Sequence, residues 1–321
     1  MMRLAICDDY QRVALSSADW SAVAKRCDIQ VFDRKLEVPD EAAEALADFD
    51  ILCLMRERMP LPRALLERLP RLKMIGVTGA HNRTLDLACA AERGIVVSYT
   101  PDSRYGTFAT AELTWGLLLA AARHIPEEHT RMRQGGWQNT VGTILRGKTL
   151  GLLGLGRIGR EVAGYGRAFG MKVQAWSQNM TPAAAEEAGV SYVDKAELFR
   201  TSDVVSIHLV LSERTRGLVG AEEFATMKPS AILVNTARGP IVHTPSLIAA
   251  LTEGRIGAAA IDVYHVEPLP ADHSLRGVPN LVMTPHLGYM TREVMRHFFE
   301  ETVANVTAFL DGRPIRLLSV T

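Results

Sequence analysis

Three segments in the second half of the sequence each place a chemically active side chain at or just after the end of an apolar run. Arg238 follows AILVNTA, Asp262 and Glu267 lie in AAAIDVYHVEP, and His286 ends LVMTPH. Histidine is the usual residue for moving a proton near neutral pH. A carboxylate beside an imidazole favours its protonated form and fixes its tautomer. With an arginine to hold and polarise a substrate, this set could exchange a proton at a carbonyl or hydroxyl oxygen.

Each of these residues also has an ordinary structural interpretation. Arg238 and Glu267 could be solvated loop charges. Asp262 could cap a turn, and His286 could pack in the interior. The catalytic interpretation is favoured because the residues follow consecutive predicted strands, and neighbouring parallel strands end at one edge of a sheet, where such sheets bind ligands.

Upstream of them, GLLGLGRIG places three glycines between a predicted strand and a predicted helix. Gly154 permits a tight turn, Gly156 lets a pyrophosphate approach the backbone, and Gly159 lets the helix pack closely on the strand. The helix N-terminus offers N–H groups to an anion, and Arg157 could add a charge. A glycine-rich turn without a ligand has the same pattern, but the strand–turn–helix context favours a dinucleotide site.

The residues that would hold the adenine ribose are unusual for such a site. An acidic residue is expected about 20 positions after the glycines, but the next strand ends in Ser177, Gln178 and Asn179, and Lys172 lies on the wrong side of that strand. Neutral side chains can bind the ribose hydroxyls of NAD but offer no positive charge to the 2′-phosphate of NADP. NAD is therefore favoured, and NADP stays open. Together the motifs predict hydride transfer between a nicotinamide cofactor and the 2-position of a small 2-hydroxy or 2-keto acid.

Predicted strands and helices, which must position these residues, alternate along almost the whole chain. The first part contains five predicted strands, which are RLAICDD, IQVFD, ILCLM, KMIGVTG and IVVSY. A second series starts at Lys148, and its seven strands are KTLGLLG, MKVQAWS, VSYVD, DVVSIHL, AILVNTA, AAAIDVY and LVMTPH. Alternation of strands and helices at this spacing predicts parallel sheets covered by helices. We therefore expect an α/β protein with two Rossmann-like, doubly wound domains and an active site in the cleft between them.

The domain boundaries follow from two further segments. TPDSRYG at 100–106 is rich in turn formers, and 109–134 predicts one long apolar helix. The last helical segment, REVMRHFFEETVANVTAFLDG, follows the second series of strands, so we expect it to pack on the first domain. The prediction is a discontinuous, flavodoxin-like substrate domain over 1–103 and 289–321, and a dinucleotide-binding domain over 104–288.

Composition narrows the possible partners. Lys+Arg and Asp+Glu both number 36, which argues against the positive surface that nucleic-acid binding requires. There is no apolar run of about 20 residues and no secretory signal pattern, so we expect no membrane partner. All four cysteines have apolar or helical surroundings that predict reduced, buried thiols, and we therefore expect a cytoplasmic protein. The four cysteines, at Cys7, Cys27, Cys53 and Cys89, form no CxxC pair. No metal site and no redox motif are therefore predicted.

TLGLLGLGRIG, NTARGPIV, AAIDVYHVEPLP and NLVMTPHLG resemble, in order and spacing, the signatures of the D-isomer-specific 2-hydroxyacid dehydrogenase family. The resemblance implies that His286 is the acid/base, that Glu267 is its partner and that Arg238 anchors the substrate carboxylate and 2-oxygen. It implies further substrate contacts, listed as Arg56 and the backbone of Gly79 and Ala80. The implied cofactor contacts are Arg157, Ile158, His208, Thr236, Ala237, Asp262 and Gly288. A homodimer is also implied, with the contact expected near 110–134 and Trp137.

The chain departs from the family pattern at several positions. Ser177 replaces the acidic ribose ligand, and Val210 replaces a proline in HLVL. Tyr289 replaces a frequent second glycine after the histidine, which puts a phenol near the site entrance and is expected to alter the accepted substrate size. Because the sequence stops at Thr321, we expect no regulatory C-terminal domain like that of the longer phosphoglycerate dehydrogenases.

Two other functions share parts of this pattern. An NAD(H)-sensing corepressor-like scaffold would keep the fold with little or no turnover, but the compact termini and the lack of a basic patch favour an enzyme. Formate dehydrogenases resemble the chain less, because they pair the histidine with a glutamine, whereas Glu267 favours proton-coupled chemistry.

Overall fold

The structure, a computed structural model, describes residues 1–319. The chain divides into two compact units, the first formed by Met1–Tyr105 with Met290–Thr321 and the second by Gly106–Tyr289. The first unit is therefore built from two separate stretches of chain. Within residues 1–319, no helix has the length and apolar character needed to span a membrane.

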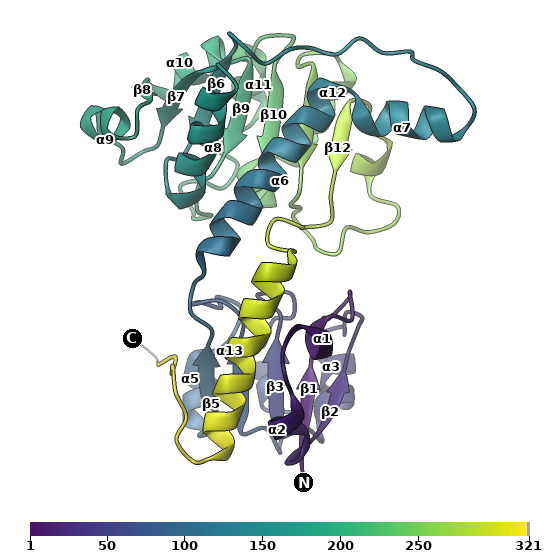
Figure 1. The fold of residues 1–321 in the computed structure, drawn as a ribbon, viewed down its shortest axis with the longest axis vertical. Helices are drawn as coiled ribbons and strands as arrows, with labels where there is room; N and C mark the ends of the chain where they lie inside the picture. Colours follow the sequence, from purple (N-terminus) through teal and green to yellow (C-terminus); the bar gives the residue numbers. More distant parts are fainter. Residues whose placement is uncertain (320–321) are drawn as a thin grey trace. The chain divides into compact units, whose positions relative to one another are not determined.

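The first unit contains a five-stranded parallel sheet in the order β2-β1-β3-β4-β5 (Figure 1). Its strands are β1 (Met2–Ile6), β2 (Cys27–Val31), β3 (Ile51–Leu54), β4 (Met74–Val77) and β5 (Val96–Tyr99). Its helices are α1 (Ala14–Ser17), α2 (Ser21–Ala24), α3 (Asp40–Leu46), α4 (Arg63–Leu66), α5 (Leu87–Glu92) and α13 (Arg292–Leu310). Helices α1, α2 and α13 pack together on one face of the sheet, and α3, α4 and α5 pack on the other.

The second unit contains a seven-stranded parallel sheet in the order β12-β11-β10-β9-β6-β7-β8. Its strands are β6 (Thr149–Leu153), β7 (Lys172–Trp176), β8 (Ser191–Tyr192), β9 (Val204–Ile207), β10 (Ile232–Asn235), β11 (Ala258–Ile261) and β12 (Leu281–Met283). Its helices are α6 (Arg104–Ala122), which begins at the unit boundary, α7 (Ile125–Arg133), α8 (Arg157–Ala168), α9 (Pro182–Glu187), α10 (Lys195–Thr201), α11 (Ala221–Thr226) and α12 (Thr244–Thr252). Two short 3-10 helices span Gly239–Ile241 and Ser274–Gly277.

Two core clusters cover the two faces of this sheet. Residues of α6 and α8 pack with the strands on one face, and residues of α10, α11 and α12 pack on the other. All strands of both predicted series are present, and every strand pair is parallel. The predicted α/β class with two parallel sheets is therefore confirmed.

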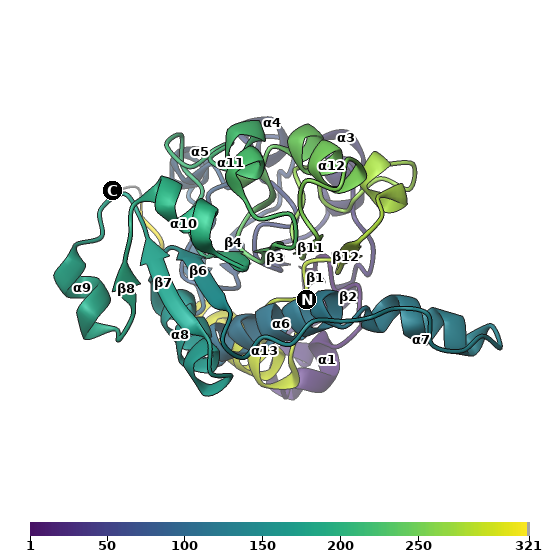
Figure 2. The ribbon, with the colours of Figure 1, turned by 90° about the horizontal axis from the view of Figure 1, so that it is seen from above.

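The prediction of a single helix over 109–134 is wrong. Helix α6 begins at Arg104, inside the segment expected to be a break, and ends at Ala122. His124 then adopts the left-handed conformation, with φ of 52°, and Pro126 lies in the first turn of α7. A proline at that position has no N–H for the carbonyl of Ala122 and its ring would clash with it, so α6 cannot continue. Helix α7 and the segment after it extend away from the body of the second unit (Figures 1 and 2).

Two segments of the first part whose composition predicts a helix form shorter helices than expected. ADWSAVAKR forms only α2, after a separate turn of helix at α1, and PRALLERLP forms the single turn α4. The last predicted helix is correct, because α13 buries Val294, Phe298 and Phe299 and contacts β4 and β5 of the first unit.

Candidate active site

The glycine-rich turn between β6 and α8 has the geometry that a pyrophosphate requires. Gly154 has a φ of 100°, a conformation that other residues rarely adopt, and a Cβ there would lie 2.8 Å from the carbonyl oxygen of His208. A Cβ on Gly159 would lie 2.3 Å from the carbonyl oxygen of Gly154, so this glycine allows α8 to pack on the turn. At Gly156 a Cβ would meet nothing within 4 Å. The turn is thus tight on its inner side and open at the residue that would face a ligand.

The start of α8 also fits an anion. Gly156 precedes the helix and has no side chain to cap its first turn, in which the N–H groups lack intrahelical acceptors. The positive end of the helix dipole therefore faces an uncapped position, as in sites that bind phosphate groups. Ser177, half-buried, and the exposed Gln178 and Asn179 follow β7, where a ribose would lie in this type of fold. The residues present fit a dinucleotide.

His208, which follows β9, lies against this turn through its backbone, and its side chain is neutral. Its carbonyl group packs on Gly154, and its Nε2 lies 2.9 Å from Oγ of Ser206. Burial lowers the pKa of His208 to about 4, so the imidazole is uncharged at neutral pH. Any contact that it makes with a cofactor would therefore be that of a neutral ring.

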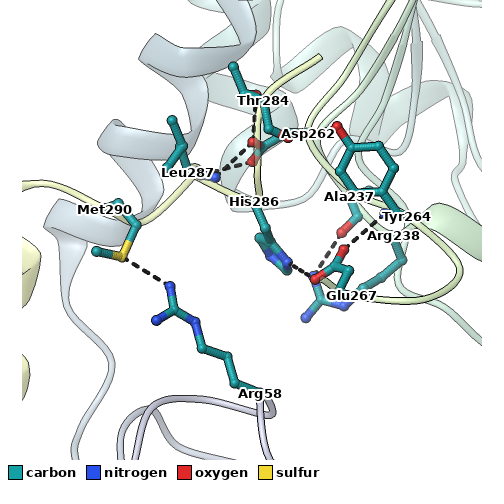
Figure 3. Close-up of polar contacts among 11 residues, drawn as sticks. Arg58, Ala237, Arg238, Asp262, Tyr264, Glu267, Thr284, His286, Leu287 and Met290 are labelled. Carbon is teal, nitrogen blue, oxygen red and sulfur yellow. Dashed lines mark hydrogen bonds and ion pairs between the residues drawn. The ribbon is translucent and has the colours of Figure 1, made fainter. Parts of the chain in front are cut away.

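The imidazole of His286 and the carboxylate of Glu267 form a close pair (Figure 3). Nδ1 of His286 lies 2.6 Å from Oε2 of Glu267, and the two side chains are 30% and 35% exposed. Burial alone would raise the pKa of Glu267, but the hydrogen bond and charge of His286, the backbone N–H of Tyr264 and the charge of Arg238 together hold this pKa below its usual range. Glu267 is therefore ionised at neutral pH. Because Nδ1 is engaged, Nε2 is the nitrogen that can face a substrate.

Arg238 lies on the loop after β10, and its guanidinium group is exposed near the carboxylate of Glu267 (Figure 3). Nη1 of Arg238 donates to the carbonyl oxygen of Ala237 over 2.7 Å. The buried side chain of Asn235 shapes this loop, since it donates to the carbonyl of Arg238 and accepts from the N–H of Ala237. Asn235 is a site residue that the sequence analysis missed, although it stands in the NTARGP motif.

The fully buried carboxylate of Asp262 binds the loop that carries His286. Its Oδ1 accepts from the hydroxyl of Thr284 over 2.6 Å and from the N–H of Leu287 over 2.7 Å, and its Oδ2 accepts from the N–H of Gly288 over 2.9 Å. Burial raises the pKa of Asp262, although these hydrogen bonds oppose the increase. Both oxygens are thus used by the protein itself, and a contact of Asp262 with a cofactor stays a prediction.

The backbone of His286 is in the left-handed region, with φ of 55°. This conformation is unfavourable for a residue with a side chain, so it persists only where neighbouring contacts hold it. The bonds from Thr284, Leu287 and Gly288 to Asp262 supply such contacts on both sides of His286. The ring of Tyr289 packs edge to face with the imidazole, with 5.6 Å between the ring centroids, and this agrees with the expected proximity of the phenol.

The predicted substrate contacts of the first unit lie at the carboxyl ends of β3 and β4. Arg56 has a φ of 53°, its N–H donates to Oγ1 of Thr78 over 2.7 Å, and its guanidinium lies 5.9 Å from the ring centroid of Phe298. The position of Gly79 favours glycine because its φ is 91°, a conformation that residues with a side chain rarely adopt, and Nη1 of Arg56 occupies the space where a Cβ would lie. The amide of Gly79, expected to face substrate, instead donates to Oγ1 of Thr100 over 2.7 Å.

Two further predicted cofactor contacts, Thr236 and Gly288, are buried and bond to helix α6. Thr236 is buried, and its hydroxyl lies 2.8 Å from that of Thr114 on α6. Gly288 is also buried, and its carbonyl accepts from Oγ1 of Thr110. Across residues 1–319, no cluster of three or more His, Cys, Asp or Glu side chains could hold a metal ion.

The chain matches the model of the family described as D-isomer specific 2-hydroxyacid dehydrogenase, NAD binding domain, over residues 115–288. It is 40% identical over 302 residues to a glyoxylate reductase of Aeropyrum pernix, covering 91% of this chain and 89% of that protein. It is 30% identical over 327 aligned positions to a hydroxypyruvate reductase of Blautia hydrogenotrophica, covering 99% of this chain and all of that protein.

Among solved structures, a phosphoglycerate oxidoreductase from Vibrio cholerae has a similar fold, with a TM-score of 0.91 and 36% sequence identity. The match covers 97% of this chain and 100% of the other. With the glycine-rich turn, the two parallel sheets and these similarities, the chain belongs to the D-isomer specific 2-hydroxyacid dehydrogenase family.

Proposed function

We propose that this protein transfers a hydride between a nicotinamide cofactor and C2 of a small 2-hydroxy or 2-keto acid. The observation that carries the proposal is the 2.6 Å contact between His286 and Glu267, in the unit that also contains the glycine-rich turn. The relatives named as glyoxylate and hydroxypyruvate reductases support the substrate class. When bound, the reduced cofactor supplies the hydride, and the residues of this chain bind the acid and manage the proton.

In the reducing direction, the protonated imidazole of His286 donates from Nε2 to the 2-oxygen of the keto acid. Glu267 stabilises the imidazolium form and fixes the ring orientation through Nδ1. The exposed guanidinium of Arg238 binds the substrate carboxylate and stabilises negative charge as it develops on the 2-oxygen. In the oxidising direction, neutral His286 accepts the hydroxyl proton.

We propose Arg56 and Ala80 as further substrate contacts. Arg56 offers a cation, and Ala80 offers a backbone amide. The amide of Gly79 already has an acceptor in Thr100, so its part is the turn that admits the Arg56 side chain. Replacing Arg56 with Ala is then expected to raise KM for the keto acid more than it lowers kcat.

NAD is the proposed cofactor. Ser177, Gln178 and Asn179 after β7 can bind ribose hydroxyls, and none of them carries a positive charge to pair with a 2′-phosphate. The direct comparison is kcat/KM with NADH and with NADPH at saturating keto acid. A lower value for NADH would reverse this part of the proposal.

The central test is a turnover assay with glyoxylate, hydroxypyruvate, 3-phosphohydroxypyruvate and branched 2-keto acids, each with NADH and NADPH. We expect reduction of at least one small keto acid, and a loss of about 10²- to 10⁴-fold in kcat for His286→Ala with cofactor binding retained. His243→Gln is the control, because His243 is exposed and its side chain bonds to Ser246, three residues further on in α12. Cofactor binding without any turnover would instead indicate a sensing scaffold.

We also propose that the arm, residues 124–146, binds a second copy of this chain. It exposes five large apolar side chains, which are Ile125 (52%), Met132 (52%), Trp137 (72%), Val141 (93%) and Ile144 (74%). Apolar groups exposed together on a projecting segment are typical of an interaction surface. Light scattering should give the mass of a dimer for the wild type. The double variant Val141→Asp with Trp137→Ser should have the mass of a monomer. A monomeric wild type would exclude this part of the proposal.

A further inference from the structure

Tyr264 contacts all three segments that carry the proposed reacting side chains. It lies two residues after Asp262 and three before Glu267, and its main chain and side chain donate to different partners. Its backbone N–H donates to Oε1 of Glu267 over 2.9 Å, and its phenol hydroxyl donates to the carbonyl oxygen of Thr284 over 2.9 Å. Thr284 is two residues before His286, so one residue is bonded to both sides of the His286–Glu267 pair.

The third contact involves the arginine loop. A Cβ built on Gly239, the residue after Arg238, would lie 2.2 Å from the carbonyl carbon of Tyr264 and 2.3 Å from its oxygen. The backbone after Arg238 therefore lies directly against the main chain of Tyr264, with no room for a side chain. The position of the arginine loop is thus set against the same residue that holds the other two segments.

The hydrogen bond of the Tyr264 phenol holds the segment that precedes His286. His286 has a φ of 55°, so the segment around it needs bonds on both sides to stay in place. After His286, Leu287 and Gly288 donate to Asp262. Before His286, the side chain of Thr284 donates to Asp262, and its carbonyl accepts from Tyr264. The same carbonyl also accepts from the N–H of His286 over 3.1 Å, but that bond lies within the segment itself. Among the described contacts of Thr284 outside its strand pairing, the phenol is therefore the bond that ties it to another segment without involving Asp262.

The phenol can keep this role over a wide pH range. Burial raises the pKa of Tyr264 to about 12, and the nearby carboxylates of Asp262 and Glu267 add to the increase. The hydroxyl consequently stays protonated and able to donate wherever the proposed proton transfer operates. A tyrosinate in this place would face the carbonyl oxygen of Thr284 and repel it.

We propose that Tyr264 is a positioning residue, whose phenol holds the Thr284–His286 segment so that the imidazole meets the carboxylate of Glu267. This inference rests on the proposed function, because it assigns a role within the same proton transfer. The alternative is that Tyr264 only fills space beneath the loop, in which case its ring would matter and its hydroxyl would not.

The test is Tyr264→Phe, which keeps the ring and the main-chain contacts and removes only the hydroxyl. We expect kcat for keto-acid reduction to fall about 2- to 10-fold, the effect of one neutral hydrogen bond. We also expect the acidic limb of the pH–rate profile to move to higher pH, because His286 helps to hold the pKa of Glu267 below its usual range and a looser pair holds it down less. Tyr192→Phe, on the exposed β8 strand, is the matched control and should behave as wild type. Circular dichroism and cofactor titration establish that Tyr264→Phe is folded.

A second comparison separates positioning from a general structural effect. In a Glu267→Gln background, Tyr264→Phe should change kcat less than 2-fold, because residues that act through one pair are not additive. An equal loss in both backgrounds with an unmoved pH profile, or no loss in either, would overturn the assignment while leaving the proposed function standing. Absence of turnover by the wild type with every keto acid and both cofactors would overturn the proposed function and the assignment together.

Discussion

Replacing Asp262 with Asn tests whether the buried carboxylate holds the His286 loop. The carboxylate accepts from three donors, which are the hydroxyl of Thr284 and the N–H groups of Leu287 and Gly288. An Asn side chain has a single acceptor oxygen. If its nitrogen takes the place of Oδ2, it faces the N–H of Gly288, and if it takes the place of Oδ1, it faces the N–H of Leu287. In either orientation one buried N–H loses its acceptor and opposes another donor.

Two contributions of opposite sign determine the size of the effect. A buried donor without an acceptor costs about 1 to 3 kcal/mol. In the variant, both the backbone N–H and the new side-chain NH₂ group of Asn lack an acceptor. Burial raises the pKa of Asp262, so folding disfavours its charged form, and the neutral Asn removes that cost. A group with a raised folded pKa stabilises the protein below its unfolded pKa and loses that contribution as pH rises. The lost acceptors outweigh this relief at pH 7, and we expect a net loss of about 1 to 3 kcal/mol in the free energy of unfolding.

The assay combines stability with turnover. Urea unfolding followed by circular dichroism gives the loss in free energy, and steady-state kinetics give a kcat that falls at least about 10-fold, because His286 is no longer held in its left-handed conformation. Asp194→Asn is the control: Asp194 caps α10 by accepting from the N–H of Glu197, and Asn caps helices equally well. A variant Asp262→Asn that unfolds and turns over like the wild type would refute the reasoning.

Two further predictions concern the cofactor side of the second unit. Gly159→Ala should destabilise the protein, because its Cβ would lie 2.3 Å from the carbonyl oxygen of Gly154. The Cβ of Gly156→Ala would meet nothing within 4 Å, so this variant should fold normally and bind NADH more weakly in a fluorescence titration. Equal unfolding midpoints for the two variants would contradict this. The pKa of His208 is lowered to about 4 in the folded protein, so the imidazole binds a proton more tightly in the unfolded chain than in the folded one. His208 therefore stabilises the folded protein above pH 6.5, and this contribution is lost as the pH falls toward 4. The unfolding midpoint of His208→Gln should therefore fall less steeply between these pH values than that of the wild type, and parallel curves would show that the ring titrates normally.

The sequence predicted the strands well because each is a short β-branched or apolar run bounded by turn residues. It predicted the helices less well where one residue decides the outcome. Pro126 ends the apolar pattern that otherwise continues from α6 into α7, and periodicity alone does not register it. In the first part, helical composition extended beyond the single turns that tertiary packing leaves helical, as in α4.

The candidate site was predictable to the extent that it depends on motifs at strand ends. Arg238, Glu267 and His286 follow neighbouring strands, and parallel order brings such ends to one edge. The supporting bonds were not predictable, because they join residues far apart in the chain. Tyr264 reaches Thr284, and Gly79 gives its amide to Thr100, through contacts that exist only once the backbone is folded.

The division of the first unit into two stretches of chain affects the order in which the protein can be completed during synthesis. The sheet of this unit is finished at Tyr99, yet one of its faces is covered by α13, which comes after the whole second unit. Until Val294, Phe298 and Phe299 emerge from the ribosome, the described helices that can cover that face are only the short α1 and α2. The second unit, whose last strand ends at Met283, can close first. The earliest part of the chain is thus the last to reach its native state, and the incompletely covered face of its sheet is the surface that a chaperone would meet.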